Sequence, residues 1–205
     1  MKIVIAATDA QWNELINSKS QIDWQRVNNS TDFIQYKDAD AFFSLKDNTI
    51  LPGFALLGKT VFINSVISTL TELKAPANVL RINGWSTFLQ RPVWETAGIL
   101  EDGIKNNFEK SGIKFNIVSD EPGFISARII AMIINEAYFA VNEAVSSKTE
   151  IDTAMKLGTN YPYGPFEWAG LIGTGHILGL LQKLNASDLR YQPAALLINE
   201  VKGNR

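Results

Sequence analysis

The stretch that decides the fold runs from residue 120 to residue 168. It opens with DEPGFIS (120–126), continues through a long apolar-striped segment to Val145, and closes with YPYGPFEW (161–168). In the long segment, mostly apolar side chains recur every three or four residues, the period of one helix face: Ile125, Ile129, Met132, Ile133, Glu136, Ala137, Ala140 and Ala144. We predict a helix of about 20 residues, or roughly 30 Å, with this face buried.

The residues after this helix carry clear start and stop signals. Ser147 and Glu150 have the spacing of a capping box, so a new helix is predicted to begin there. Gly158 can adopt the left-handed conformation that ends it. Pro162 and Pro165 exclude helix between them, and Pro165 suits the first position of the next helix. The aromatic side chains of 161–168 are interpreted as core around this turn, with ligand stacking as the alternative.

The first part of the chain alternates short β-branched runs with helical segments, which is typical of an α/β fold. The predicted strands are residues 2–7, 22–27, 33–36, 41–45, 59–66, 78–83 and 113–118. The predicted helical segments are 9–16, 68–74 and 96–110. No strand pattern follows residue 120. In this last part of the chain, two more helices are predicted to begin at Thr174 and Pro193. We therefore predict two domains, an α/β domain over 1–119 and an all-α domain over 120–205.

Composition narrows the possible partners. The chain has 205 residues, a net charge of −2 and no cysteine. This charge provides no basic field for nucleic acid or for an anionic membrane, so neither partner is expected. The missing cysteines exclude disulfides and thiolate metal sites, and no metal site is predicted. The apolar run 1–7 is too short for a signal peptide or a spanning helix, so we expect a cytoplasmic protein.

Three runs keep a recognisable order and spacing. They are DEPGFISARIIAMIINEA (120–137), IDTAMKLGTNYPYGPFEWAGLIG (151–173) and YQPAALLINEV (191–201). Together they resemble the C-terminal helical domain of 3-hydroxyacyl-CoA dehydrogenases. The resemblance implies a shortened Rossmann-like parallel sheet domain in front of the helices, NAD as cofactor and acyl-CoA as substrate. It also implies fatty-acid or 3-hydroxybutyryl-CoA metabolism and a homodimer formed by the helical domain.

The expected phosphate-binding loop departs from the family pattern. A dinucleotide domain needs G-x-G-x-x-G after its first strand, because glycines let the backbone approach the pyrophosphate. Here the first strand leads into residues 6–11, AATDAQ, and no glycine precedes Gly53. Asp9 also places a carboxylate where the phosphate charge belongs. The resemblance predicts NAD at this loop, whereas the residues themselves argue against its usual binding mode.

The expected catalytic pair departs as well. In the family, a histidine removes the hydroxyl proton while hydride leaves, and a glutamate orients it. The matching run here is RINGWSTFLQRPVWETAG (81–98), which retains Glu95. An ungapped count places Asn83 at the histidine position, and a gapped match places Ser86 there. An amide does not titrate and a lone hydroxyl stays protonated, so the pair is predicted to be broken.

The substrate-binding residues implied by the resemblance are only partly present. Asn64 and Ser65 resemble the family's Asn-Thr-Ser segment, whose hydroxyls contact substrate; the alternative is a strand end leading into a helix cap. Ala127 stands where the family has an asparagine. His176 is the only histidine, and it is interpreted as a surface or capping residue, with catalysis as the alternative.

These observations give a leading interpretation and two alternatives. The leading one is a 3-hydroxyacyl-CoA dehydrogenase relative with a shortened nucleotide domain and weak or lost redox activity. The first alternative is a non-catalytic acyl-CoA-binding or assembly protein that retains the helical dimer. The second is a dehydrogenase whose base comes from a partner chain.

Overall fold

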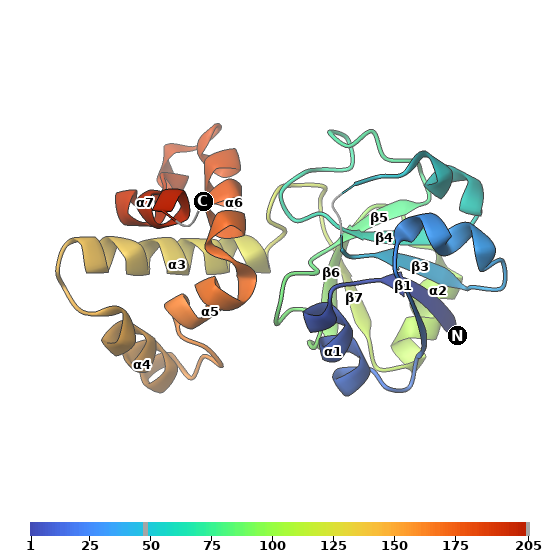
Figure 1. Cartoon of the computed structure of the whole chain (residues 1–205), viewed down its shortest axis with the longest axis horizontal. Helices are drawn as coiled ribbons and strands as arrows, with labels where there is room; N and C mark the ends of the chain where they lie inside the picture. The colour runs from blue at the N-terminus through green and yellow to red at the C-terminus, as the bar shows by residue number, and fades with distance from the viewer. Residues whose placement is uncertain (47–48, 204–205) are drawn as a thin grey trace. The chain divides into compact units, whose positions relative to one another are not determined.

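The computed structural model describes residues 1–46 and 49–203 (Figure 1). By their contacts, the residues divide into a sheet unit, Met1–Phe124, and a helical unit, Ile125–Arg205. Residues 120–124 belong to the sheet unit because Asp120 and Phe124 both contact Arg81. That residues 1–119 and 120–205 fold as two independent domains remains a prediction.

The sheet unit contains seven strands in its described residues, in the order β2-β1-β3-β4-β5-β6-β7. Neighbouring strands are parallel, except that β5 and β6 are antiparallel. The strands are β1 (Lys2–Ala6), β2 (Asp23–Val27), β3 (Ala41–Ser44), β4 (Thr60–Asn64), β5 (Val79–Ile82), β6 (Val93–Ala97) and β7 (Lys114–Ile117). The predicted Rossmann-like α/β architecture is confirmed.

Helices cover both faces of this sheet. One face carries α1 (Asp9–Ser18) and α2 (Asp102–Lys110), whose Leu15 and Phe108 join the core cluster of Ile3 and Ile5. The other face carries two 3-10 helices, η1 (Ser30–Gln35) and η2 (Pro52–Leu57), whose aromatic rings join the cluster of Val4. Successive β1 residues thus alternate between the two cores, as the two-residue period of a strand requires.

Three predicted elements of the sheet unit were wrong. Residues 33–36 belong to η1 and not to a strand, because the chain turns after Asn29 and buries Phe33. Residues 93–97 form β6, so the helix predicted over 96–110 begins only at Asp102; Gly98, at a φ of 119°, separates the two. Residues 68–74 form hydrogen-bonded turns, and Lys74 ends them in a left-handed conformation.

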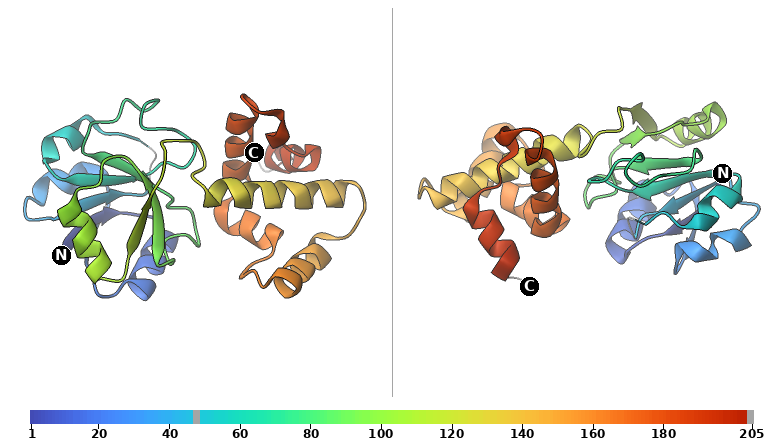
Figure 2. Two further views of the ribbon diagram at one scale, coloured as in Figure 1. Left: turned by 180° about the vertical axis from the view of Figure 1, so that it is seen from behind. Right: turned by 90° about the horizontal axis from the view of Figure 1, so that it is seen from above.

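The helical unit packs its other helices around the long α3 (Figure 2). Its elements are α3 (Ser126–Asn142), α4 (Lys148–Thr159), α5 (Pro165–Ile172), α6 (Thr174–Asn185), η3 (Leu189–Tyr191) and α7 (Ala195–Gly203). The Ser147 and Glu150 capping box and the start of α5 at Pro165 are confirmed. The end of α4 was misplaced, because Asn160 takes the left-handed conformation that was predicted for Gly158.

The face of α3 that was predicted to be buried is largely open in this chain. Ile125 and Ile129 are 50% and 54% exposed, and Glu136 is exposed. The buried face is offset around the helix and is lined by Ala127, Ile130, Ala131, Ile134, Asn135, Ala137 and Tyr138. Apolar residues recur at helical spacing on both faces of α3. The sequence period therefore predicts the helix but does not show which of the two faces α5, α6 and α7 cover.

Among the described residues, no helix is long and apolar enough to cross a bilayer.

Candidate functional site

The candidate site lies at the carboxyl edge of the sheet. The chain passes from β1 outward to β2 and then returns to β3 on the other side of β1. Ligands of open α/β sheets bind outside the carboxyl ends of the strands at such a reversal of strand order. The loops at this edge begin at Ala7 after β1, Leu45 after β3, Ser65 after β4 and Asn83 after β5.

The start of α1 is capped by its own residues. The Thr8 hydroxyl accepts from the backbone N–H of Gln11 at 3.3 Å, and the Gln11 side chain accepts from the backbone N–H of Thr8 at 3.0 Å. Asp9, in the first turn, forms an ion pair with Arg26 at 2.6 Å. Arg26 also donates to the Ala7 carbonyl at 2.9 Å.

These residues do not fit the pyrophosphate of a dinucleotide. A helix N-terminus binds a phosphate through free backbone N–H groups and a close backbone approach. Here the N–H groups of Thr8 and Gln11 already have side-chain partners, and the Asp9 carboxylate adds a like charge. The expectation from the residues is therefore supported by geometry, and we derive no chemical step that uses NAD at this loop.

The structure brings Asn83 and Glu95 together across the antiparallel pair β5 and β6. The register pairs Ile82 with Thr96, and the backbone N–H of Asn83 donates to the Glu95 carbonyl at 3.4 Å. Asn83 is 5% exposed. Ser86 lies in the turn segment between the two strands and is half-buried.

Two further charged groups surround this hairpin. Burial lowers the pKa of Arg91, while Glu95 and Glu14 favour its charged form. The Glu14 carboxylate accepts from the backbone N–H of Thr87 at 2.6 Å. Burial raises the pKa of Glu14, although the backbone N–H groups of residues 87, 89 and 90 oppose this effect. The Glu14 carboxylate therefore caps the turn that follows Asn83.

The remaining predicted site residues are buried or bonded within their own units. The Asn64 amide bonds to the loops after β3 and β5. The Ser65 hydroxyl is buried and donates to the Ser68 carbonyl at 2.8 Å. Ala127 is 0% exposed on α3 of the helical unit. His176 lies in the first turn of α6, and its Nδ1 atom is 2.8 Å from the Ile172 carbonyl oxygen.

The aromatic residues around the 161–168 turn pack against one another. The rings of Tyr161 and Tyr163 contact Trp168, with centroids 5.6 and 5.9 Å away. Trp168 is 2% exposed. The interpretation as core is therefore confirmed for Trp168, whereas Tyr161, Tyr163 and Phe166 are half-buried.

Sequence reasoning missed the buried cation Arg81. Its guanidinium is 0% exposed, donates to the carbonyls of Ser65, Ser68 and Glu121, and pairs with Asp120 at 2.9 Å. Burial lowers the pKa of Arg81, and Asp120 acts in the opposite direction. The available signal was an arginine inside the otherwise apolar strand run of β5, since a charge in a buried run requires a partner.

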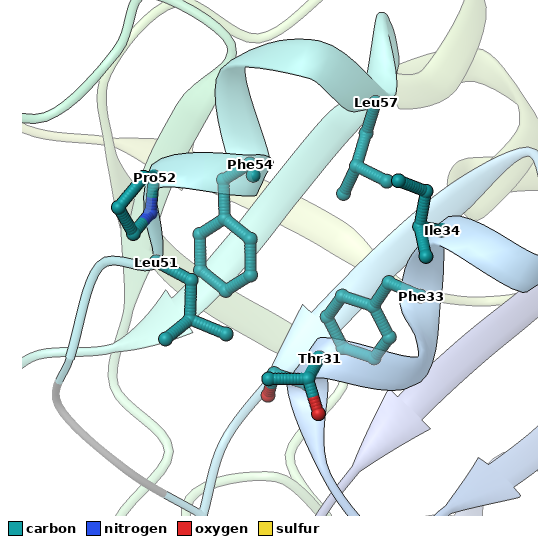
Figure 3. Close-up of a pocket in the computed structure, with 9 residues that line it drawn as sticks. Thr31, Phe33, Ile34, Leu51, Pro52, Phe54 and Leu57 are labelled. Carbon is teal, nitrogen blue, oxygen red and sulfur yellow. The ribbon is translucent and has the colours of Figure 1, made fainter.

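A pocket between η1 and η2 was also missed. It encloses about 230 Å³ and is lined mainly by apolar side chains, as Figure 3 shows: Phe33, Ile34, Leu51, Pro52, Phe54 and Leu57. The pocket was not predicted because residues 33–36 were predicted to be a strand and not part of a 3-10 helix. In the part of the chain that the structure describes, no group of three or more histidine and carboxylate side chains could hold a metal ion.

Comparison with known proteins follows the same division. Residues 123–205 match the family model of the 3-hydroxyacyl-CoA dehydrogenase C-terminal domain. The chain is 48% identical over 82 residues to 3-hydroxyadipyl-CoA dehydrogenase of Escherichia coli K12, covering 39% of this chain and 17% of that protein. It is 41% identical over 96 residues to a probable 3-hydroxybutyryl-CoA dehydrogenase of Bacillus subtilis, covering 46% and 33%.

The whole chain is similar in fold to a solved dehydrogenase. The (S)-3-hydroxybutyryl-CoA dehydrogenase of Ralstonia eutropha superposes with a TM-score of 0.72 at 20% identity, covering 100% of this chain and 86% of that one. The chain therefore has the fold class of a Rossmann-like sheet domain followed by a helical C-terminal domain. In sequence, the chain thus resembles 3-hydroxyacyl-CoA dehydrogenases in their C-terminal domain, over 39% and 46% of its length for the two relatives. Its matches span at most a third of the two curated relatives named above.

Proposed function

We propose that this protein is a 3-hydroxyacyl-CoA dehydrogenase relative that binds acyl-CoA and has weak or lost NAD-dependent redox activity. Its place would be in fatty-acid or 3-hydroxybutyryl-CoA metabolism, which the names of its relatives support. One observation carries the proposal: the residue opposite Glu95 in the β5 and β6 hairpin is Asn83. The cytoplasmic location remains a prediction.

The chemical argument concerns the proton of a 3-hydroxyl group. Its removal during hydride transfer requires a side chain that accepts a proton near neutral pH, and such a base contributes about 10²- to 10⁴-fold in rate. The Asn83 amide has no such state. Glu95 is retained, but the residue opposite it, Asn83, is not a base that it could orient.

Turnover assays test this proposal directly. Purified protein with acetoacetyl-CoA and NADH is expected to show no loss of the reduced-cofactor absorbance above background. A kcat of about 1 s⁻¹ or more, the ordinary range of enzymes, would contradict the loss of activity. Glu95→Gln is the control for contamination, since a rate that this variant leaves unchanged arises outside the site.

A second arm tests acyl-CoA binding. Acetoacetyl-CoA alone, at about 100 times its dissociation constant, is expected to add about 2.7 kcal/mol to stability and to raise the Tm. Free acetoacetate at the same concentration is the control for the coenzyme A part. No shift with acetoacetyl-CoA would favour an assembly protein without an acyl-CoA site.

The open face of α3 supports a homodimer formed by the helical unit. A groove of about 510 Å³ runs along Ile129, Met132 and Ile133, and is also lined by Arg128, Glu136, Arg190 and Tyr191. Because a two-fold interface pairs a surface with itself, one patch that carries apolar side chains and both charge signs is self-complementary. This groove is the surface that we assign to the partner subunit.

Light scattering after size exclusion tests the dimer. Ile129→Glu is expected to shift the protein to a monomer, because a carboxylate would be buried without a partner. Leu157→Glu is the matched control, since Leu157 is 83% exposed on α4 outside the groove. A wild-type monomer at micromolar concentration would contradict the proposed dimer.

A further inference from the structure

The buried side chain of Gln11 connects three loops of the carboxyl edge. It is 6% exposed. Its Nε2 atom donates to the carbonyls of Leu45 at 3.1 Å and Gly84 at 3.0 Å. Its Oε1 atom accepts from the backbone N–H of Thr8 at 3.0 Å and from the Thr8 hydroxyl at 3.1 Å. An amide has two donor and two acceptor positions, so Gln11 uses all four within the chain.

A second amide joins two of the same loops. Asn64 donates from Nδ2 to the Leu45 carbonyl at 3.3 Å and accepts the Gly84 N–H at Oδ1, 3.0 Å away. A Cβ atom at Gly84 would lie 2.9 Å from Cγ of Asn64, which explains glycine at this position. We call Gln11, Asn64 and their shared partners Leu45 and Gly84 the amide latch.

The amide latch lies where an extended ligand would cross the sheet. It joins the loops after β1, β3 and β5 and the last residue of β4, and it spans the strand reversal between β1 and β3. A dinucleotide placed on this edge would have to separate these loops. Each buried donor or acceptor that lost its partner would cost about 1 to 3 kcal/mol, and 1.4 kcal/mol is a tenfold change in affinity.

Charge at the adjoining helix acts in the same direction. Asp9 lies in the first turn of α1 and already occupies the favourable field of the helix N-terminus. Arg26, the cation beside it, pairs with Asp9 and donates to Ala7. A pyrophosphate at this point would meet a carboxylate and a cation that is already paired.

We infer that the amide latch and Asp9 together exclude a dinucleotide from the carboxyl edge of the sheet unit. The loops at this edge are bonded to one another by the side chains of Gln11 and Asn64. This deepens the proposed function, because it adds loss of the cofactor site to loss of the base. It rests on contacts within the sheet unit alone.

The binding test uses the dinucleotides themselves. NADH is titrated into the full chain while its fluorescence and energy transfer from tryptophan are recorded, and NAD⁺ is tested by thermal shift. No saturable signal is expected up to on the order of 1 mM, which corresponds to about 4.1 kcal/mol of binding. Saturable binding tighter than this overturns the inference.

Hydrogen exchange tests the amide latch without any ligand. Gln11→Glu keeps the shape but places an oxygen against the Gly84 carbonyl in place of the donating NH₂. The repulsion is expected to move the loop after β5 away from Asn64 Oδ1, which accepts the Gly84 N–H, so exchange of that N–H should accelerate at least tenfold. Gln25→Glu is the matched control, because Gln25 is an exposed amide on β2. Unchanged Gly84 exchange in Gln11→Glu overturns the amide latch. If that variant does not fold, Asn64→Ala removes the acceptor of the same N–H group.

The two proposals fail separately. NADH binding without turnover would overturn the inference and leave the missing base standing. Absence of acetoacetyl-CoA binding, with NADH also unbound, would overturn the proposed acyl-CoA function and leave the inference standing.

Discussion

The sheet unit and the helical unit differ in how far their folds can be recognised from the sequence. The family model matches residues 123–205, which are the helical unit and the two residues before it, whereas the full chain matches a solved dehydrogenase only in fold, at 20% identity. The contacts differ accordingly. Gln11 bonds to Gly84 across 73 positions of the sequence, while Ser147 and Glu150 cap α4 from three residues apart. A cap can be read as a motif, whereas a long-range amide bond leaves no local pattern.

Polar side chains also have different structural roles in the two units. In the sheet unit, buried polar groups such as Arg81 and Gln11 hold loops together at one edge. In the helical unit, Asn135 and Asp152 bond to backbone groups at the starts of later segments. Four experiments test how much each unit depends on such contacts.

Loss of the buried cation is expected to have the largest effect. Arg81→Met removes the partner of Asp120 and the donor to three carbonyls. The sheet unit is expected to lose about 3 kcal/mol, the low end for a buried pair, because the Asp120 side chain is 27% exposed. Urea unfolding, with hydrogen exchange to assign the loss to β4 and β5, measures it. Lys2→Met, at an ion pair whose partner Asp38 is exposed, is the control in the same unit and should leave the urea midpoint nearly unchanged.

Crowding the start of α5 tests the helical unit. A Cβ atom at Gly164 would lie 2.3 Å from Oδ1 of Asp152, which accepts from the N–H of Phe166. Gly164→Ala is expected to cost about 1 to 3 kcal/mol by overpacking, since a φ of −74° excludes backbone strain as the cause. Gly170→Ala, in the same helix with open space around it, should instead stabilise by roughly 0.5 to 1 kcal/mol. Equal midpoints for the two variants would contradict the crowding.

The two capping boxes offer a direct comparison between the units. Ser147→Ala is expected to cost about 1 kcal/mol, the ordinary value of a cap. Thr8→Ala should cost more, about 1 to 2 kcal/mol, because the buried Gln11 side chain also loses the Thr8 hydroxyl as a donor. Thr8→Ser, which keeps the hydroxyl, is the control. Equal losses in thermal unfolding would show that the amide latch adds nothing to the cap.

The smallest expected effect is a pH dependence at Glu14. Burial raises the pKa of Glu14 above 4.5, so the folded state binds this proton more tightly than the unfolded state. The associated stability is present below pH 4.5 and is lost as the pH rises through the folded pKa. Relative to wild type, Glu14→Gln should therefore gain stability between pH 4.5 and 7. Glu109→Gln, on an exposed part of α2, controls for removing one carboxylate. A difference that does not change with pH would contradict the assignment.

Local signals explain what could be predicted and what could not. The starts of α4 and α5 were predictable because capping boxes and prolines act within four residues. Strand β6 was missed because Val93 and Trp94 follow Pro92 in a run whose pairing partner, β5, lies across a turn. The 3-10 helix η1 was missed because Phe33 and Ile34 fit a strand equally well by residue type.

The candidate site divides in the same way. The missing glycines and the Asn83 position were visible in the sequence, since each is a residue type at a known spacing. The hydrogen bonds from the Gln11 amide to Leu45 and Gly84 could not be predicted from the sequence. They depend on the order of the parallel strands β1, β3, β4 and β5. The open face of α3 was invisible for a related reason, as two apolar faces share one period.

By itself, the sequence determined the likeness of the helical unit to the dehydrogenase C-terminal domain, the α/β class of the sheet unit and the absence of a glycine loop after the first strand. Those features depend on residue type and short spacing, which the covalent chain carries directly. Only the tertiary structure decided which face of α3 is buried, where Arg81 finds its partners and how two amides close the carboxyl edge. These depend on segments far apart in sequence meeting in space, where the cost of an unpaired buried polar group selects one arrangement.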